Sequence, residues 1–284
     1  MRQILIYCLL SLPIMIMLGW FYFDKRKLKR KEARRAVLNA KPLAPEYLQI
    51  LKTQYPLYSR LPEELQRKLV SHIQVFLDEK DIIGRGEFDV IDTVRVLIAA
   101  QACTLLLNRP GNYYPGFRTI LVYPDTYVAS STQHDGLLQV TSTSTRAGES
   151  WHRGPIVLAW EHVLQGALDS RDGHNVVMHE FAHKLDEENA AMDGLPLLPT
   201  AEQYQQWSHV LSAEFAVQQR KLANGDNDVI DSYGATSPAE FFAVVTETFF
   251  EKPQQLQRHH PKLYEQFKQC YLLNPLEWRE LNQS

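Results

Sequence analysis

Two histidines four positions apart constrain this chain most strongly, because they share one turn of a predicted helix with Glu180. The stretch His179-Glu180-Phe181-Ala182-His183 places both imidazoles on one helical face, since residues i and i+4 lie about one turn apart. That spacing lets the two rings bind one tetrahedral Zn²⁺. Glu180 directly follows the first histidine, so it is predicted to lie beside the metal as a general base and not as a ligand.

The surrounding segment has the pattern of a helix. From Gly173 to Asp186, apolar and small residues recur with the amphipathic spacing of a helix and not with the alternation of a strand. Asp172 or Asn175 is predicted to cap its start, because a short side-chain oxygen can accept from the free backbone N–H groups there. The alternative interpretation is a histidine pair on a solvated helix face, with Glu180 as an ordinary helix former.

A catalytic zinc site needs a third protein ligand and an open fourth position. No further histidine follows His183 at the spacing H-x-x-G-x-x-H, so a downstream carboxylate is expected to be that ligand. Glu240 and Glu247 lie two turns apart on one face of a second predicted helix, which is mostly apolar. Glu240 also fits a capping box with Ser237, in which its carboxylate would bond back to the Ser237 N–H. Spacing alone leaves the choice between Glu240, Glu247 and the other acids open.

A family resemblance adds to this interpretation. From about residue 148 to residue 251 the chain resembles the Mlc titration factor A family of zinc peptidases. The motifs that carry the resemblance are SW at 150–151, GPIVL at 154–158, HEFAHKLD at 179–186, YGA at 233–235 and SPAEFFAV at 237–244. It implies that His179, His183 and Glu240 bind zinc and that Glu180 is the catalytic base. It also implies an α+β, zincin-like fold of the gluzincin type, similar to the catalytic domain of anthrax lethal factor.

The resemblance further implies a role for Tyr233, which stands seven residues before Glu240. By analogy it would hydrogen-bond the developing oxyanion, whereas the alternative is a loop tyrosine packed on the domain. Asp186, Asp231 and Glu247 are further candidates, because an acid near the site can orient a ligand imidazole. For these three acids the alternative roles are helix capping and surface charge.

The rest of the pattern predicts one mostly helical domain with a small sheet over residues 46–284. Helical patterns cover residues 62–81, 89–108, 172–186, 200–224, 237–250 and 261–273, and strand-like runs cover 119–123, 136–141 and 156–160. The run at 155–160 fits two interpretations equally well. It is either an edge strand that an extended peptide could join, or a fully buried core strand.

The N-terminus predicts a membrane anchor. Residues 4–23 carry no charge over 20 positions, which is long enough to cross a hydrocarbon core of about 30 Å. Eight basic residues and two acids follow at 24–35, so the positive-inside rule predicts a single-pass protein of the inner membrane with its domain in the cytoplasm. Residues 24–45 are interpreted as a polybasic juxtamembrane linker. The alternative, a cleaved signal peptide, requires the opposite order of charge and a small-residue cleavage site.

The distribution of charge and the cysteines restrict the classes of partner and metal site that the chain is expected to have. Residues 1–35 have a net charge of +7 and the remainder −10, which the whole-chain value of −3 conceals. An acidic domain argues against a nucleic-acid partner. The three cysteines, Cys8, Cys103 and Cys270, form no C-x-x-C motif, which is consistent with a reducing compartment and with the absence of a thiolate metal site.

Together these patterns predict a membrane-anchored zinc metallopeptidase that cleaves peptide or protein substrates with one Zn²⁺ per chain. The resemblance links the family to aminopeptidase activity. The alternative hypothesis, from another functional class, is a non-catalytic binding protein that sequesters a transcriptional repressor of sugar uptake.

Overall fold

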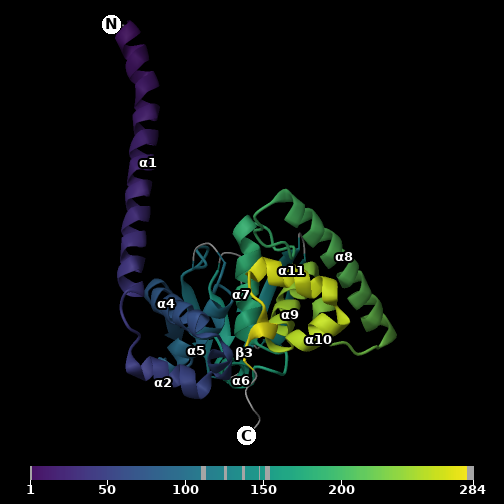
Figure 1. The fold of residues 1–284 in the computed structure, drawn as a ribbon. Helices are drawn as coiled ribbons and strands as arrows, with labels where there is room; N and C mark the ends of the chain where they lie inside the picture. The colour runs from purple at the N-terminus through teal and green to yellow at the C-terminus, as the bar shows by residue number, and fades with distance from the viewer. Residues whose placement is uncertain are drawn as a thin grey trace. The chain divides into compact units, whose positions relative to one another are not determined.

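The computed structural model describes residues 2–109, 113–124, 127–135, 138–146, 148–150 and 154–279, without the side chains of residues 2–16, 18 and 127–150. The chain forms two compact units, Met1–Pro42 and Leu43–Ser284 (Figure 1). The first unit is helix α1 (Arg2–Asn39), which includes most of the predicted polybasic linker. The second unit begins at Leu43 and its first helix is α2 (Pro45–Gln54), so the predicted boundary between residues 45 and 46 lies at the start of this helix.

The predicted membrane anchor lies in α1, and most of its side chains are outside the described residues. In the part of the chain that was described, no helix combines the length and the apolar character needed to cross a membrane. The anchor therefore stays a prediction.

The second unit is mostly helical, with one small sheet and a separate hairpin. Its helices after α2 are α3 (Pro56–Arg60), α4 (Glu63–Glu79), α5 (Asp92–Thr104), α6 (Trp160–Leu168), α7 (Val176–Asp186), α8 (Ala201–Asn224), α9 (Pro238–Glu251), α10 (Pro253–His259) and α11 (Pro261–Tyr271). Short 3-10 turns lie at η1 (Glu187–Asn189), η2 (Ser232–Ala235) and η3 (Pro275–Glu277). This architecture confirms the predicted α+β class.

The strands are β1 (Asp81–Gly84), β2 (Thr119–Tyr123), β3 (Tyr127–Asp135), β4 (Leu138–Arg146), β5 (Gly148–Ser150) and β6 (Ile156–Ala159). The main sheet has the order β1-β2-β6-β5, in which the first three strands are parallel and β5 is antiparallel to β6. Strands β3 and β4 pair with each other as an antiparallel hairpin.

Strand β6 lies inside the sheet, and all four of its residues are buried. Of the two interpretations of residues 155–160, the core strand is therefore right and the edge strand is wrong. An apolar run without alternation is typical of a strand that is covered on both faces. The edge of the sheet on that side is β5, which contacts α7.

Helix α7 contacts β5 and β6 of the sheet and packs against α9 (Figure 1). Helix α9 is buried around its whole circumference from Phe241 to Glu251, as expected for a helix that is apolar on every side. Aromatic rings from α8, α9 and α11 pack together behind it, including Trp207, Phe242 and Phe267. The two helices that carry the predicted ligands are thus held within the core.

Candidate metal centre

The N-terminus of α7 is capped by Asn175, one of the two residues predicted for this role. Its Oδ1 accepts from the backbone N–H of Met178 at 2.9 Å. Asp172 instead accepts from the N–H of His174 in the preceding turn. With this cap, α7 begins three residues before His179, so both imidazole rings project from its first two turns.

Helix α9 presents Glu240 from its own first turn. Pro238 is the first helical residue, and the Ser237 Oγ accepts from the N–H of Glu240 at 3.1 Å. This is one half of the predicted capping box. The Glu240 carboxylate does not complete the box, because it points across to the two histidines of α7.

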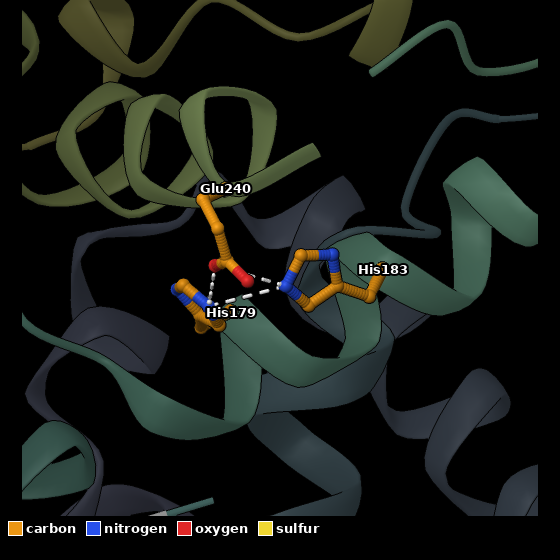
Figure 2. A group of neighbouring side chains, drawn as sticks. All are labelled: His179, His183 and Glu240. Atoms are coloured by element: carbon orange, nitrogen blue, oxygen red, sulfur yellow. Dashed lines mark hydrogen bonds and ion pairs between the residues drawn. The ribbon is translucent and has the colours of Figure 1, made fainter. Parts of the chain in front are cut away.

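Three side-chain atoms converge between α7 and α9 (Figure 2). Glu240 Oε2 lies 2.9 Å from His179 Nε2 and 3.3 Å from His183 Nε2, and the two nitrogens are 3.2 Å apart. In the described part of the chain, His179, His183 and Glu240 are the group of histidines, cysteines and acids arranged to hold a metal ion. Spacing left the third residue open, and the geometry brings Glu240 to the two histidines.

Glu247 lies on the opposite side of the His179 ring. Its Oε1 is 2.8 Å from His179 Nδ1, while its Oε2 accepts from the backbone N–H of Asn175. A carboxylate can only accept, so Nδ1 donates to Glu247, which leaves Nε2 as the ring nitrogen that can bind a metal ion. Glu247 therefore fixes the tautomer of His179 and belongs to the surroundings of the cluster, not to its centre.

The donor set fits a tetrahedral metal ion. Ligands 2.0–2.1 Å from zinc at tetrahedral angles are roughly 3.3 Å apart, and the three pairs of atoms here are separated by 2.9–3.3 Å. Burial raises the pKa of Glu240, but hydrogen bonds to His179 and His183 outweigh that effect and the net shift is downward. The carboxylate is therefore ionised, as a metal ligand must be.

Glu180 is buried beside this cluster, and its Oε2 has no hydrogen-bond partner within the described residues. Burial raises the pKa of the Glu180 carboxyl to about 7, although the neighbouring histidines lower it. Buried polar atoms are normally hydrogen-bonded, so an unpartnered carboxylate oxygen beside this cluster is unusual.

Tyr233 lies on η2, where its ring centroid is 6.0 Å from that of His179 and its side chain is half-exposed. The Asp231 carboxylate accepts from the Tyr233 N–H at 2.8 Å, so Asp231 caps this 3-10 turn. The structure thus brings the ring of Tyr233 beside the cluster.

Asp186 has a structural role that differs from the prediction. It is fully buried and accepts from the N–H groups of Gly194 and Leu195, each at 2.8 Å. It therefore holds the loop after α7 and does not orient an imidazole. Gly194 has φ +78°, and a Cβ there would lie 2.5 Å from the carbonyl oxygen of Pro238, so this loop packs directly on the start of α9.

Glu251, which the sequence analysis did not single out, also joins the two helices. Its carboxylate accepts from the Gly173 N–H at 3.0 Å and from the Asn175 side-chain amide at 3.1 Å. Burial raises the pKa of Glu251 well above its ordinary value. The sequence could have indicated this role, because Glu247 and Glu251 are acids four positions apart on a mostly apolar helix.

Comparisons with known proteins agree with this geometry. A family model described as "Glucose-regulated metallo-peptidase M90" matches residues 27–272. The uncharacterized protein slr2042 of Synechocystis sp. is 45% identical over 245 residues, which cover 86% of this chain and 89% of that protein. Mlc titration factor A of Escherichia coli (strain SMS-3-5 / SECEC) is 34% identical over 226 residues, covering 78% of this chain and 84% of the relative. The protein of the same name from Shigella sonnei matches to the same extent.

Proposed function

This chain belongs to the glucose-regulated metallo-peptidase M90 family, and from that premise we propose that it is a zinc-dependent peptidase. His179, His183 and Glu240 are the proposed ligands of one Zn²⁺ in a zincin-like domain. The observation that carries the proposal is the convergence of two Nε2 atoms and one carboxylate oxygen, all within 4.8 Å of one another, beside the buried Glu180.

Zinc in such a site acts as a Lewis acid and lowers the pKa of a water molecule. Glu180 is the proposed general base, which takes the proton from that water and later gives it to the departing amine. Its burial next to the cluster supports this role, because a base works best with a pKa near the working pH. Tyr233 would donate a hydrogen bond to the oxygen that becomes negative during the attack.

Strand β5 is the proposed binding edge for a peptide substrate. It ends the main sheet and contacts α7, which carries both histidines. An extended peptide could add to such an edge through main-chain hydrogen bonds. We propose removal of N-terminal residues as the mode of cleavage, on the basis of the family resemblance. Cleavage of a mixed peptide library would show this mode as stepwise loss from the N-terminus, and internal cuts would contradict it.

The decisive experiment measures metal and cleavage together. The purified full chain is expected to hold about one zinc per chain and to cleave peptides, and both properties should be lost in His179→Ala. The exposed His259, which lies far along the chain on α10, provides the control His259→Ala, which should keep both. A wild-type protein that binds no metal under zinc-replete conditions would overturn the proposal.

A second candidate function rests on the name Mlc titration factor A that relatives carry. In this alternative the chain binds a transcriptional repressor of sugar uptake and sequesters it without cleavage. Glu180→Gln separates the two functions, because it removes the base but keeps the ligands. Repressor binding that survives in a cleavage-dead Glu180→Gln protein would show that sequestration is independent of catalysis.

We also propose that residues 4–23 anchor the protein in the inner membrane, with the second unit in the cytoplasm. The 20 uncharged positions and the basic residues that follow them support this proposal. The intact protein should stay with the membrane fraction through high-salt and alkaline washes. Release by salt alone would indicate electrostatic adhesion of the polybasic segment instead.

A further inference from the structure

A cavity of about 770 Å³ lies at the C-terminal end of α7, apart from the candidate metal centre. Its described lining comes from four places: the end of α7 with η1, the segment between α5 and β2, the segment before α8, and the end of α11. The three cluster residues and Glu180 are not among these lining residues. The volume falls within the range of about 300–1,000 Å³ that is usual for small-molecule sites.

Most of the cavity wall is apolar. Phe117 is the aromatic residue of this wall with accessible surface, and Leu197, Leu198 and Leu272 contribute aliphatic side chains. The ring of Tyr114 packs edge-on against Phe181 of α7, with centroids 4.7 Å apart, so this wall is continuous with the core. Such a wall suits a ligand with an apolar body about the size of an aromatic ring.

Arg109 is the exception in this wall. Its Nη1 donates to the Cys270 carbonyl at 2.9 Å and to Cys270 Sγ at 3.0 Å, and its Nη2 donates to the Leu197 carbonyl at 3.4 Å. A guanidinium has five N–H groups, so at least two of them are left over. No acid among the described residues forms an ion pair with Arg109. Glu188 lines the same cavity and interacts with Arg109 electrostatically without forming an ion pair with it, so the unused N–H groups of Arg109 can still donate to an acceptor.

The other charged residues of the cavity are one lysine and two glutamates. Lys184 and Glu187 pair with each other at 2.9 Å and together add no net charge. Burial raises the pKa of Glu188, and the charge of Arg109 lowers it. The cavity thus presents the donor groups of Arg109 near one acid that would repel a dianion, and a monoanion fits it best.

The backbone around the cavity is strained at three residues with left-handed φ. They are Tyr114 (φ 49°), Ala190 (φ 68°) and Leu272 (φ 53°). Among the described residues, Glu87 is the other non-glycine residue with a positive φ. Ala190 and Leu272 end η1 and α11, positions at which glycine would relieve the strain. Strained residues of this kind concentrate at ligand sites, and all three line the cavity.

We propose that this cavity is a second binding site, for a small carboxylate with an apolar body. The carboxylate pairs with the unused N–H groups of Arg109, and the body lies against Phe117 and Leu272. A planar guanidinium fork matches a carboxylate in geometry as well as in charge. The same chemistry occurs in a free organic acid and at the C-terminus of a peptide.

Calorimetric titration of the full chain with three matched probes tests the charge requirement. The probes are 4-phenylbutyrate, 4-phenylbutanol and 4-phenylbutylamine, which share one body and differ in the head group. A charge-assisted hydrogen bond should make the acid bind about tenfold or more tightly than the alcohol, and the amine should not bind. Equal affinity for acid and alcohol, or no binding of the acid at millimolar concentration, would overturn the proposal.

Acetylated dipeptides that end in phenylalanine, with a free or an amidated C-terminus, distinguish the two sources of the carboxylate. Tighter binding of the free-acid peptide than of 4-phenylbutyrate would assign the site to peptide C-termini. Tighter binding of 4-phenylbutyrate would assign it to small organic acids. If neither 4-phenylbutyrate nor the free-acid peptide binds more tightly than 4-phenylbutanol or the amidated peptide, the proposed recognition of a carboxylate is contradicted.

Arg109→Gln should weaken binding of 4-phenylbutyrate about tenfold or more, and Arg258→Gln should leave it unchanged, because Arg258 is exposed on α10. Thermal unfolding of each variant checks that the fold is kept. If Arg109→Gln does not fold, the comparison of probes on the wild-type protein still decides the question.

The metal centre is the competing place for a carboxylate, and chelation separates the two sites. Protein stripped of metal by a chelator should bind 4-phenylbutyrate as tightly as the untreated protein does. Binding that is lost on stripping but kept in Arg109→Gln would place the acid on the metal and overturn the proposal.

Discussion

Glu247 of α9 accepts a hydrogen bond from His179 Nδ1 at 2.8 Å, on the side of the ring that faces away from Glu240. The same carboxylate accepts from the backbone N–H of Asn175, four residues before His179. One acid therefore sets both the tautomer of a proposed ligand and the position of the helix that carries it. Orienting groups of this kind are often as important for metal affinity as the ligands themselves.

Glu247→Gln is expected to weaken zinc binding about 10- to 100-fold. Both carboxylate oxygens of Glu247 accept hydrogen bonds, and an amide has only one oxygen, so its NH₂ group would face a donor. Competition with a chelator of known affinity measures the change. Glu265→Gln on the exposed face of α11 is the matched control, and an unchanged affinity in Glu247→Gln would show that the hydrogen bond has no part in metal binding.

Glu180→Gln is expected to keep zinc but to lower peptide cleavage by about a hundredfold or more, the usual contribution of a general base. The substitution preserves the shape of the side chain and removes its ability to take a proton. Metal content and kcat/KM on one peptide are the two measurements. Unchanged cleavage at full metal content would exclude Glu180 as the base.

Gly194→Ala is expected to destabilise the fold by about 2–4 kcal/mol. Its left-handed φ is unfavourable for alanine, and the new Cβ would also lie 2.5 Å from the Pro238 carbonyl oxygen. Gly225→Ala separates these effects, since φ is +74° there but nothing lies within 4 Å of the added Cβ. That control should cost only about 1–2 kcal/mol in chemical denaturation. Equal losses in the two variants would argue against close packing of this loop on α9.

The stability of the fold should decrease as pH rises from about 6.5 to about 9, through the titration of His260. Its Nδ1 lies 2.7 Å from Glu214 Oε2 and its Nε2 lies 3.0 Å from Asp228 Oδ2. Burial lowers the pKa of His260, but its hydrogen bonds to the two carboxylates raise it, to a net value of about 9. Because the folded pKa exceeds the unfolded value of 6.5, the stabilisation is complete below pH 6.5 and is lost as pH rises through 9.

The full contribution of His260 is about 3 kcal/mol at most. Urea unfolding at several pH values measures it in the wild-type protein and in His260→Gln, whose stability should vary less over this range. His259→Gln, at the exposed neighbouring position, should behave as the wild type does. A wild-type stability that rises with pH across the same window would contradict the assignment.

Local patterns predicted the elements of the site well. Strand β2 has the predicted bounds, and α7 and α9 form where the apolar periodicity and the caps place them. The choice between Glu240 and Glu247 was beyond such patterns, because the two acids lie on one face of the same helix. They differ in which nitrogen of His179 they meet, and that depends on how α9 packs against α7.

The position of β6 in the sheet also depended on long-range pairing. Its apolar sequence is compatible with either an edge or an interior position in the sheet. The strand is interior because it pairs with β2 on one side and with β5 on the other. Asp186 and Asp231 were predicted to lie near the ligands, but each bonds the backbone of its own neighbourhood. An acid in a sequence does not reveal whether its partner is a ring nitrogen or a backbone N–H.

The two histidines and Glu240 come from helices that are docked together although 57 and 61 positions separate the acid from the histidines in the chain. Neither helix alone contains a complete set of proposed ligands. A metal ion can therefore be bound only once α9, which follows α8 in the chain, has packed against α7. Metal binding is then linked to folding: free zinc at 100 times its dissociation constant would stabilise the native state by about 2.7 kcal/mol. Scarcity of zinc in the cell would thus lower the abundance of the protein as well as its activity, because unfolded chains are degraded.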